Sequence, residues 1–142
     1  MNILVTGGTG FIGKPLVEAL LSRGDTVTVL TRSIEKAQAV FSEKTPQFLT
    51  ALSTLKDLNT FDAVINLAGE PIFDKKWTVQ QKEKLRHSRI NLTQQLVRLI
   101  NQSEYPPALI SGSATGIYGN YGDEQITENT NPSRSEERRV GK

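Results

Sequence analysis

The residues of this sequence that are best placed to do chemistry are three glycines near its N-terminus. Gly7, Gly10 and Gly13 recur at three-residue intervals within TGGTGFIG, which spans residues 6–13. In such a loop the first glycine lets the chain turn sharply, the second lets the backbone approach a phosphate, and the third lets a helix pack closely. The free N–H groups and positive end of a helix that begins near Phe11 would attract an anion. The alternative is a glycine-rich turn without a ligand.

The position of this loop favours the ligand-binding interpretation. It follows an apolar run at residues 2–6 that predicts a strand, and it precedes a stretch with helical spacing. A glycine triplet between a strand and a helix is the context in which the pyrophosphate of a dinucleotide binds. The residues expected to contact the pyrophosphate are Gly7, Thr9, Gly10, Phe11, Ile12 and Gly13.

The residues after the second expected strand bear on which dinucleotide the loop would hold. An NAD site places Asp or Glu about 20 residues after the glycine loop, where the acid binds the ribose hydroxyls. This sequence has Thr31, Arg32 and Ser33 there, and its next acid is Glu35. A guanidinium binds a 2′-phosphate through charge-assisted hydrogen bonds worth about 1.5–3 kcal/mol, and the two hydroxyls could add contacts. NADP is therefore expected over NAD, unless Arg32 is only a solvated loop charge.

Short apolar runs alternate with helical stretches along the chain, which predicts a parallel sheet covered by helices. Strands are expected at 2–6, 26–31, 46–50, 63–67 and 108–111, and helices at 11–23, 34–41 and 78–101, with a helical turn within 52–58. Ser33 and Thr78 are expected to cap the second and third helices. The pattern is typical of a doubly wound, Rossmann-like α/β domain of about five strands. A complete domain usually has a sixth strand, so the fifth is expected to be an unpaired edge.

Composition limits the class of protein. The chain has 142 residues, 37% of them hydrophobic and none of them cysteine, which suits one domain with a moderate core. The absence of cysteine excludes a disulfide scaffold, a zinc ribbon, an iron–sulfur site and a thiol nucleophile. No apolar run approaches the roughly 18 residues that a membrane span needs, and neither a membrane partner nor a signal peptide is expected. A cytoplasmic protein is consistent with these features.

The net charge of +2 comes from the last nine residues, RSEERRVGK at 134–142. The rest of the chain has equal numbers of acidic and basic side chains, so no nucleic-acid partner is expected. These nine residues match the in-frame translation of a common sequencing-adapter oligonucleotide. We therefore expect an incomplete NAD(P)-binding domain at 1–133 and a non-native tail at 134–142. The alternative is a natural, charged and disordered C-terminus.

Two motifs together resemble those of a known family. TGGTGFIG at 6–13 and NLAGE at 66–70 are similar to the glycine loop and the fourth-strand motif of the extended short-chain dehydrogenase/reductase superfamily, which includes NAD(P)-dependent epimerases and dehydratases. An atypical epimerase-like branch shares further segments with this chain. These are PI at 71–72, KWT at 76–78, Lys82, SR at 88–89 and SGSATGIYG at 111–119. The resemblance covers residues 1 to about 130, and the family continues well past this point, so it implies an N-terminal fragment.

The fourth and fifth strands add residues to the expected site. Leu67, Ala68 and Gly69 end a central strand, where small side chains let a cofactor approach, although they could also form only a strand-exit turn. The resemblance implies that Glu70 lies near the nicotinamide end, whereas a solvated loop acid would look the same in the sequence. Ser111, at the end of the fifth strand, is also expected to contact the cofactor.

The set of expected catalytic residues is less complete than the set of expected cofactor-binding residues. Ser113 aligns with the catalytic serine of the superfamily, which hydrogen-bonds the reacting oxygen of the substrate; the alternative is a serine in a strand-to-loop turn. The superfamily also uses Tyr-x-x-x-Lys, in which the lysine lowers the pKa of the tyrosine. No tyrosine here has a lysine four residues later, so Tyr118 is interpreted as a cofactor-site or packing residue. Arg89 could pair with Glu70 or remain a surface charge, and His87, the only histidine, is expected in solvent rather than at a metal.

Three functional hypotheses follow. The parent protein is expected to be an NADP-dependent epimerase or oxidoreductase that moves hydride at a hydroxyl or carbonyl carbon of an unknown substrate, with Ser113 orienting the substrate oxygen. The alternative is a sensor or scaffold that binds NADPH without turnover, since the tyrosine–lysine pair is missing. The third is a fragment too short to fold and bind. For the 142-residue chain itself, cofactor binding with negligible catalysis is expected.

Overall fold

The computed structural model describes residues 1–41, 44–71, 76–114, 117–119 and 121–131. Three sequence features named above lie outside these residues, namely Ile72, Thr115-Gly116 and the tail at 134–142. The described residues form one sheet of the strands β1 (Asn2–Thr6), β2 (Thr26–Leu30), β3 (Gln47–Leu49), β4 (Ala63–Asn66) and β5 (Ala108–Ser111). The helices are α1 (Gly13–Ser22), α2 (Ile34–Gln38) and α3 (Val79–Gln102), with a short 3-10 turn, η1, at Leu52–Thr54.

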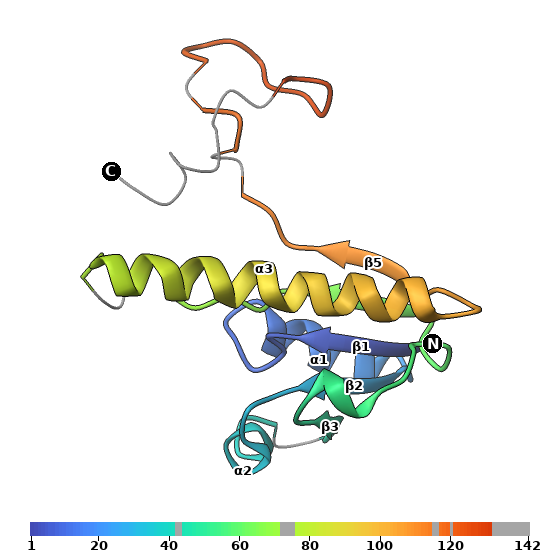
Figure 1. Cartoon of the computed structure of the whole chain (residues 1–142). Coiled ribbons are helices and arrows are strands. Elements are labelled where there is room, and N and C mark those ends of the chain that lie inside the picture. The colour runs from blue at the N-terminus through green and yellow to red at the C-terminus, as the bar shows by residue number, and fades with distance from the viewer. Residues whose placement is uncertain (42–43, 72–75, 115–116, 120, 132–142) are drawn as a thin grey trace.

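The sheet is parallel throughout, and its strand order is β3-β2-β1-β4-β5 (Figure 1). At its centre, Val5 of β1 is in register with Val29 of β2 and Ile65 of β4. The chain moves outward from β1 to β3 and then crosses back to β4, so the strand order reverses between β1 and β4. In such sheets the ligand binds at this reversal, beyond the carboxyl ends of the strands. The predicted doubly wound α/β fold is confirmed. The first and last residues of every strand lie within one residue of the expected ones.

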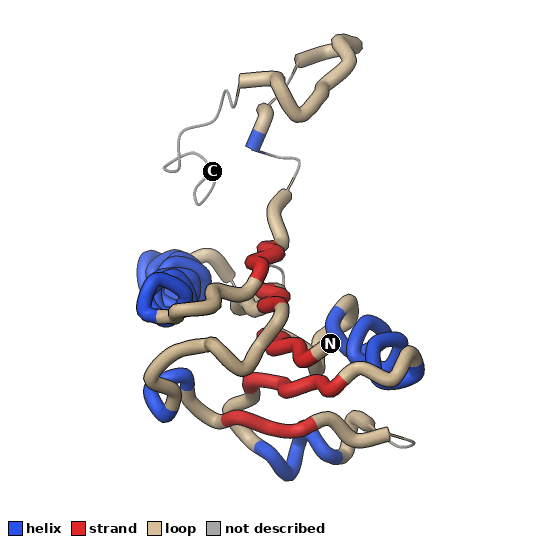
Figure 2. Tube along the Cα trace, turned by 90° about the vertical axis from the view of Figure 1, so that its right-hand side faces the viewer, coloured by secondary structure: helices blue, strands red, loops and turns tan. Residues whose placement is uncertain are grey.

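Two buried cores lie on opposite faces of the sheet. Ile3 and Val5 of β1 belong to the cluster that includes α1, whereas Leu4 of β1 belongs to the cluster that includes Leu96 and Leu99 of α3. Figure 2 shows α1 and α3 on opposite sides of the strands. Because both faces are covered, β1 and β4 each have three consecutive apolar residues, at 3–5 and 63–65, whereas β2 alternates threonine with valine.

Both expected helix caps are present. The Ser33 hydroxyl accepts a hydrogen bond from the Lys36 N–H at 3.4 Å, and the Thr78 hydroxyl accepts one from the Gln81 N–H at 3.2 Å. These bonds satisfy N–H groups that have no partner within the first turns of α2 and α3. The sequence therefore located the starts of these two helices correctly.

The bounds of α1 and α2 differ from those expected. The glycine turn delays the start of α1 to Gly13, since the Gly10 N–H is bound to the Gly7 carbonyl at 3.0 Å. The second helix ends at Gln38 instead of continuing to residue 41. There the Phe41 N–H binds the carbonyl three residues back, which tightens the chain and brings the Phe41 ring into the core beside α1.

β5 is the outer strand on the side of α3, and all four of its residues are exposed. Within the described part of the chain nothing pairs with its outer edge. In both views the described residues after Gly112 lead away from the sheet (Figures 1 and 2). Among the described helices, none has both the length and the apolar character needed to cross a bilayer.

Replacing Leu96 with alanine is expected to lower the free energy of unfolding by about 3 kcal/mol, because the removed side chain leaves a cavity in the α3 core. Leu96 is fully buried, whereas its neighbour Val97 is 39% exposed. Val97→Ala is therefore expected to change stability by less than about 1 kcal/mol. Urea unfolding followed by circular dichroism measures both variants, and equal losses would contradict the placement of this helix face.

Candidate functional site

The glycine loop leaves β1 as a tight turn pressed against the end of β4. Gly7 has a φ of 71°, in the left-handed region that favours glycine. A Cβ on Gly7 would lie 2.8 Å from main-chain atoms of Leu67 and Ala68. A Cβ on Gly13 would overlap the Gly7 carbonyl oxygen, so the start of α1 rests on the turn itself. Both positions need glycine for steric reasons, independently of any ligand.

The other two glycines of the loop have different surroundings. A Cβ on Gly8 would meet the side chain of Val29 at 2.9 Å and that of Val17 at 3.2 Å, so Gly8 faces the core. This role was missed, because the three-residue spacing of the motif passes over Gly8. Within the described part of the chain, a Cβ on Gly10 would approach only the Gly7 carbonyl, at 3.2 Å. Gly10 is therefore the glycine that is open to a ligand.

The backbone N–H groups of Phe11 and Ile12 are available to an anion. Two nearby N–H groups are bonded internally, since Gly10 donates to the Gly7 carbonyl and Lys14 donates to the Gly10 carbonyl at 2.9 Å. Neither Phe11 nor Ile12 has an acceptor for its N–H among the described residues, and Phe11 is 98% exposed. Free N–H groups at a helix start attract phosphate. The loop therefore fits the pyrophosphate that its sequence predicts.

Most predicted site residues can be reached from solvent. The exposed ones are Thr9, Gly10, Phe11, Ile12, Arg32, Gly69, Ser111 and Ser113, the half-buried ones are Gly7, Thr31, Ser33, Leu67, Ala68 and Glu70, and Gly13 is buried. They follow the carboxyl ends of β1, β2, β4 and β5, which lie at one edge of the parallel sheet. The structure thus brings them to the edge where such sheets bind ligands.

A hydrogen-bond network ties the ends of three strands together. The Thr6 hydroxyl donates to the Asn66 side-chain carbonyl at 2.7 Å and accepts from the Ala68 N–H at 3.2 Å. The Asn66 side-chain amide donates to the hydroxyls of Thr93 at 3.1 Å and Ser111 at 3.2 Å. Thr6 and Asn66 are buried, so these bonds replace those to water. Sequence reasoning missed Thr6 and Thr93; the available signal was a threonine at the last buried position before the glycine turn.

Beyond β2, two hydroxyls are held by local hydrogen bonds while Arg32 is exposed. The Thr31 hydroxyl donates to the Ser33 carbonyl at 3.1 Å, and the Ser33 hydroxyl donates to the Glu35 carboxylate at 2.9 Å. The Glu35 backbone N–H and the Ser33 hydroxyl lower the pKa of the Glu35 carboxyl, which is therefore ionised at neutral pH. A positive and a negative side chain thus share the turn where a 2′-phosphate is expected.

The segment after β4 is held from two sides. On the β1 side, the Leu67 N–H donates to the Thr6 carbonyl at 3.1 Å. On the α3 side, the Ser88 hydroxyl accepts from the Glu70 N–H at 3.0 Å, and the Arg89 guanidinium donates to the Glu70 carbonyl at 3.2 Å. Of the two alternatives for Arg89, a pair with Glu70 or a surface charge, the structure shows a contact with Glu70, made to its main-chain carbonyl.

The end of β5 contributes less to the described site. The Ser111 hydroxyl is engaged by Asn66, and its contact with a cofactor stays a prediction, as does the substrate role of Ser113. Tyr118 is half-buried, and its interpretation as a cofactor-site or packing residue stays a prediction. Among the described residues, no three His, Asp or Glu side chains are grouped so that they could hold a metal ion.

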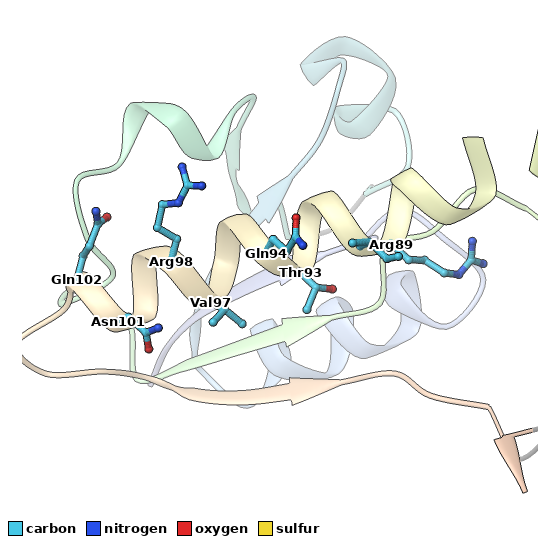
Figure 3. A pocket seen from close by; sticks show the side chains of 8 residues that line it. Arg89, Thr93, Gln94, Val97, Arg98, Asn101 and Gln102 are labelled. Atoms are coloured by element: carbon cyan, nitrogen blue, oxygen red, sulfur yellow. The ribbon is translucent and has the colours of Figure 1, made fainter. Parts of the chain in front are cut away.

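A groove runs along α3, away from the glycine loop. Its lining comes from this one helix and consists of Arg89, Ile90, Thr93, Gln94, Val97, Arg98, Asn101 and Gln102 (Figure 3). Two of these residues, Arg89 and Thr93, also bind groups at the carboxyl edge of the sheet. The groove therefore borders the site but does not form it.

Comparison with known families gives one clear match and several relatives. The model of the NAD dependent epimerase/dehydratase family matches residues 3–138. The epimerase family protein YfhF of Bacillus subtilis is 37% identical over 131 residues, which cover 92% of this chain and 43% of that protein. The chloroplastic epimerase family protein SDR39U1 homolog of Arabidopsis thaliana is 38% identical over 125 residues, covering 84% and 36%. The chain thus spans less than half the length of either relative.

Solved structures share the same fold. Human epimerase family protein SDR39U1 (isoform 2), solved with NADPH, has a TM-score of 0.69 at 32% identity, covering 83% of this chain and 38% of that one. The UDP-glucose-4-epimerase of Stenotrophomonas maltophila, solved with NAD and formylated UDP-arabinopyranose, has a TM-score of 0.74 at 20% identity, covering 93% and 42%. At that identity the second likeness shows the fold alone.

Replacing Thr6 with valine is expected to lower the free energy of unfolding by about 2 kcal/mol. Valine keeps the shape of the side chain, but the Asn66 carbonyl and the Ala68 N–H then lose a buried partner. The matched control is Thr28→Val in β2, since the Thr28 hydroxyl is 3.5 Å from its acceptor on Gln47 and is bound weakly. Chemical unfolding measures both. A Thr6→Val protein as stable as the control would show that the network does not hold the strand ends.

Proposed function

The chain belongs to the NAD-dependent epimerase/dehydratase family, and from this premise we propose that its glycine loop binds the pyrophosphate of NADP(H). The observation that carries the proposal is the pair of free N–H groups on Phe11 and Ile12, at the start of α1. Gly7 and Gly13 hold the loop in its shape, and Gly10 leaves room for the backbone to approach a phosphate.

We infer a preference for NADP(H) over NAD(H) from the turn after β2. Arg32 is exposed there and supplies a guanidinium for the 2′-phosphate, a group that NAD lacks. The human relative solved with NADPH supports this choice, while the more distant UDP-glucose-4-epimerase was solved with NAD. Glu35 opposes the preference, because its carboxylate shares the turn. Charge at residues 31–35 therefore decides between the two cofactors.

The other half of the cofactor is proposed to extend past the end of β4. Leu67, Ala68 and Gly69 would lie along the ribose, with Glu70 and Ser111 at the nicotinamide end. The bound nicotinamide supplies or accepts a hydride, which suits chemistry at a hydroxyl or carbonyl carbon. Ser113 would donate a hydrogen bond to the reacting oxygen of the substrate. The substrate itself is left open, because fold does not define it.

A second function has an observation of its own. None of the three tyrosines is followed by a lysine four residues later, so the chain lacks the proton-transfer pair that the superfamily uses. A protein that binds NADPH without turnover, as a sensor or scaffold, would need only the cofactor site. For the 142 residues in hand we propose cofactor binding with negligible catalysis. Hydride exchange between labelled NADPH and a panel of carbonyl compounds, using the full-length protein, separates this function from the enzymatic one.

Titration with NADPH is expected to shift the amide resonances of Phe11 and Ile12 more than that of Lys14, whose N–H already has an acceptor. At about 100 times its Kd, NADPH should stabilise the protein by about 2.7 kcal/mol. Two-dimensional NMR and thermal unfolding measure the two effects. A chain ending at Ser133 serves as the control and is expected to bind equally, because residues 134–142 are proposed to lie outside the domain. No thermal shift at millimolar NADPH or NADH would overturn the proposed function.

Arg32→Ala is expected to weaken NADPH binding by about tenfold or more while leaving NADH binding nearly unchanged, because only NADPH carries the 2′-phosphate. Arg23→Ala is the matched control. It also removes one arginine, but at the opposite end of β2, where Arg23 pairs with Asp25 at 2.6 Å. Isothermal titration with both reduced cofactors measures the difference.

The carboxylate of Glu35 at the same turn is expected to have the opposite effect on NADPH binding. Glu35→Gln removes the carboxylate beside Ser33 and is expected to strengthen NADPH binding a few-fold at most, because the exposed carboxylate is screened by solvent. If Arg32→Ala weakened NADH and NADPH equally, Arg32 would not read the 2′-phosphate.

A further inference from the structure

Two neighbouring residues of α3 bind the two main-chain polar groups of one residue, Glu70, in the segment after β4. The Glu70 N–H donates to the Ser88 hydroxyl at 3.0 Å, and the Glu70 carbonyl accepts from Nη2 of Arg89 at 3.2 Å. Both side chains are anchored to their own helix. The Ser88 hydroxyl donates to the Leu85 carbonyl at 2.8 Å, and Nη1 of Arg89 donates to the same carbonyl at 3.1 Å. Since Leu85 is buried in α3, the segment after β4 is fastened to a rigid element.

The residue before Glu70 leaves room for this arrangement. A Cβ on Gly69 would lie 2.8 Å from Cζ of Arg89 and 2.9 Å from its Nη2. The guanidinium therefore packs directly over the Gly69 backbone, and alanine at this position would push it aside. Figure 3 shows the Arg89 side chain extending along α3 away from Val97 and Asn101. Arginine suits the task because its planar fork binds two carbonyls at once, which a lysine ammonium does less well.

The clamped segment lies on a defined side of the cofactor crevice. The turn after β2 is the side on which a 2′-phosphate is expected, and the start of α1 is the place of the pyrophosphate. A dinucleotide that crosses the reversal between β1 and β4 must therefore direct its other half past the end of β4. Residues 67–70 follow that strand, so Glu70 stands on the nicotinamide side.

We propose that Ser88 and Arg89 are positioning residues that clamp the Glu70 main chain and so shape the nicotinamide half of the cofactor site. This proposal rests on the proposed function, in that it takes the crevice to hold a dinucleotide. The clamp acts through the backbone, so it fixes where residues 68–70 lie without itself touching substrate. The adenosine half, held at β2 and α1, is independent of it.

The test compares Arg89→Lys and Arg89→Met with the same changes at Arg98. Arg98 lies on the same helix, is also exposed and lines the same groove, but it has no hydrogen bond to the described residues 67–71. Two probes are titrated, NADPH and 2′,5′-ADP, which carries only the adenosine half. Hydrogen exchange of the Glu70 amide is followed by NMR in the absence of either ligand.

Arg89→Met is expected to speed Glu70 exchange and to weaken NADPH binding by about tenfold. Arg89→Lys should cause smaller changes of the same kind, and neither variant should change 2′,5′-ADP binding. The Arg98 variants should change none of these. Equal weakening of both ligands, or unchanged NADPH binding, would overturn the proposal. If the wild-type chain binds neither ligand, the proposed function fails together with the cofactor part of this proposal, and the exchange rate alone decides whether the clamp exists.

A double-mutant cycle tests the steric part of the clamp. Gly69→Ala alone is expected to displace the guanidinium and to speed Glu70 exchange, whereas in the Arg89→Met background it should have little further effect. Gly69 has no left-handed φ, so alanine is compatible with its backbone. Additive effects of the two substitutions would contradict direct packing of Arg89 on Gly69.

Discussion

The close approach of the Gly7 turn to the end of β4 is the constraint on which the rest of this structure depends. There is no room for a Cβ between Gly7 and the main chain of Leu67 and Ala68, so two segments far apart in sequence are in direct backbone contact. The Thr6 hydroxyl completes the junction by binding Ala68 and Asn66. A loop fixed in this way needs little reorganisation before an anion binds, which lowers the entropic cost of association.

The two halves of the crevice are held by different means. After β2, the turn is stabilised locally, by hydroxyls that bind within residues 31–35. After β4, the segment is stabilised by distant elements, namely β1 and α3. Local turns tolerate substitution, so the charge at Arg32 and Glu35 can change without disturbing the sheet. The segment after β4 has no such freedom, since its main chain is bound on both sides. The proposed cofactor preference therefore rests on residues that can be changed more easily than those that hold the segment after β4.

Much of the fold was predictable because local signals and the global fold agree. The strands coincide with short stretches rich in apolar or β-branched residues, and the caps at Ser33 and Thr78 are side-chain effects that act within one turn. The glycine loop was predictable because its spacing reflects steric needs of the loop itself. What escaped prediction depends on contacts between distant segments. Nothing near Gly8 in the sequence indicates the Val29 side chain, and nothing near Thr6 indicates Asn66.

Helix α3 shows why residues that support a site are hard to recognise in the sequence of an amphipathic helix. Its buried residues Leu85, Leu96 and Leu99 form a stripe with helical spacing. Ser88 and Thr93 fall on or beside the same stripe, so the sequence suggests a core that is interrupted by polar residues. The interruptions lie where the helix passes the carboxyl edge of the sheet, and there Ser88 and Thr93 bind Glu70 and Asn66. The Ser88 hydroxyl also donates to the Leu85 carbonyl of its own helix, so a polar residue in a buried stripe can be satisfied without any site. Only the bonds that these residues accept from Glu70 and Asn66, which are distant in sequence, identify them as supports of the site edge.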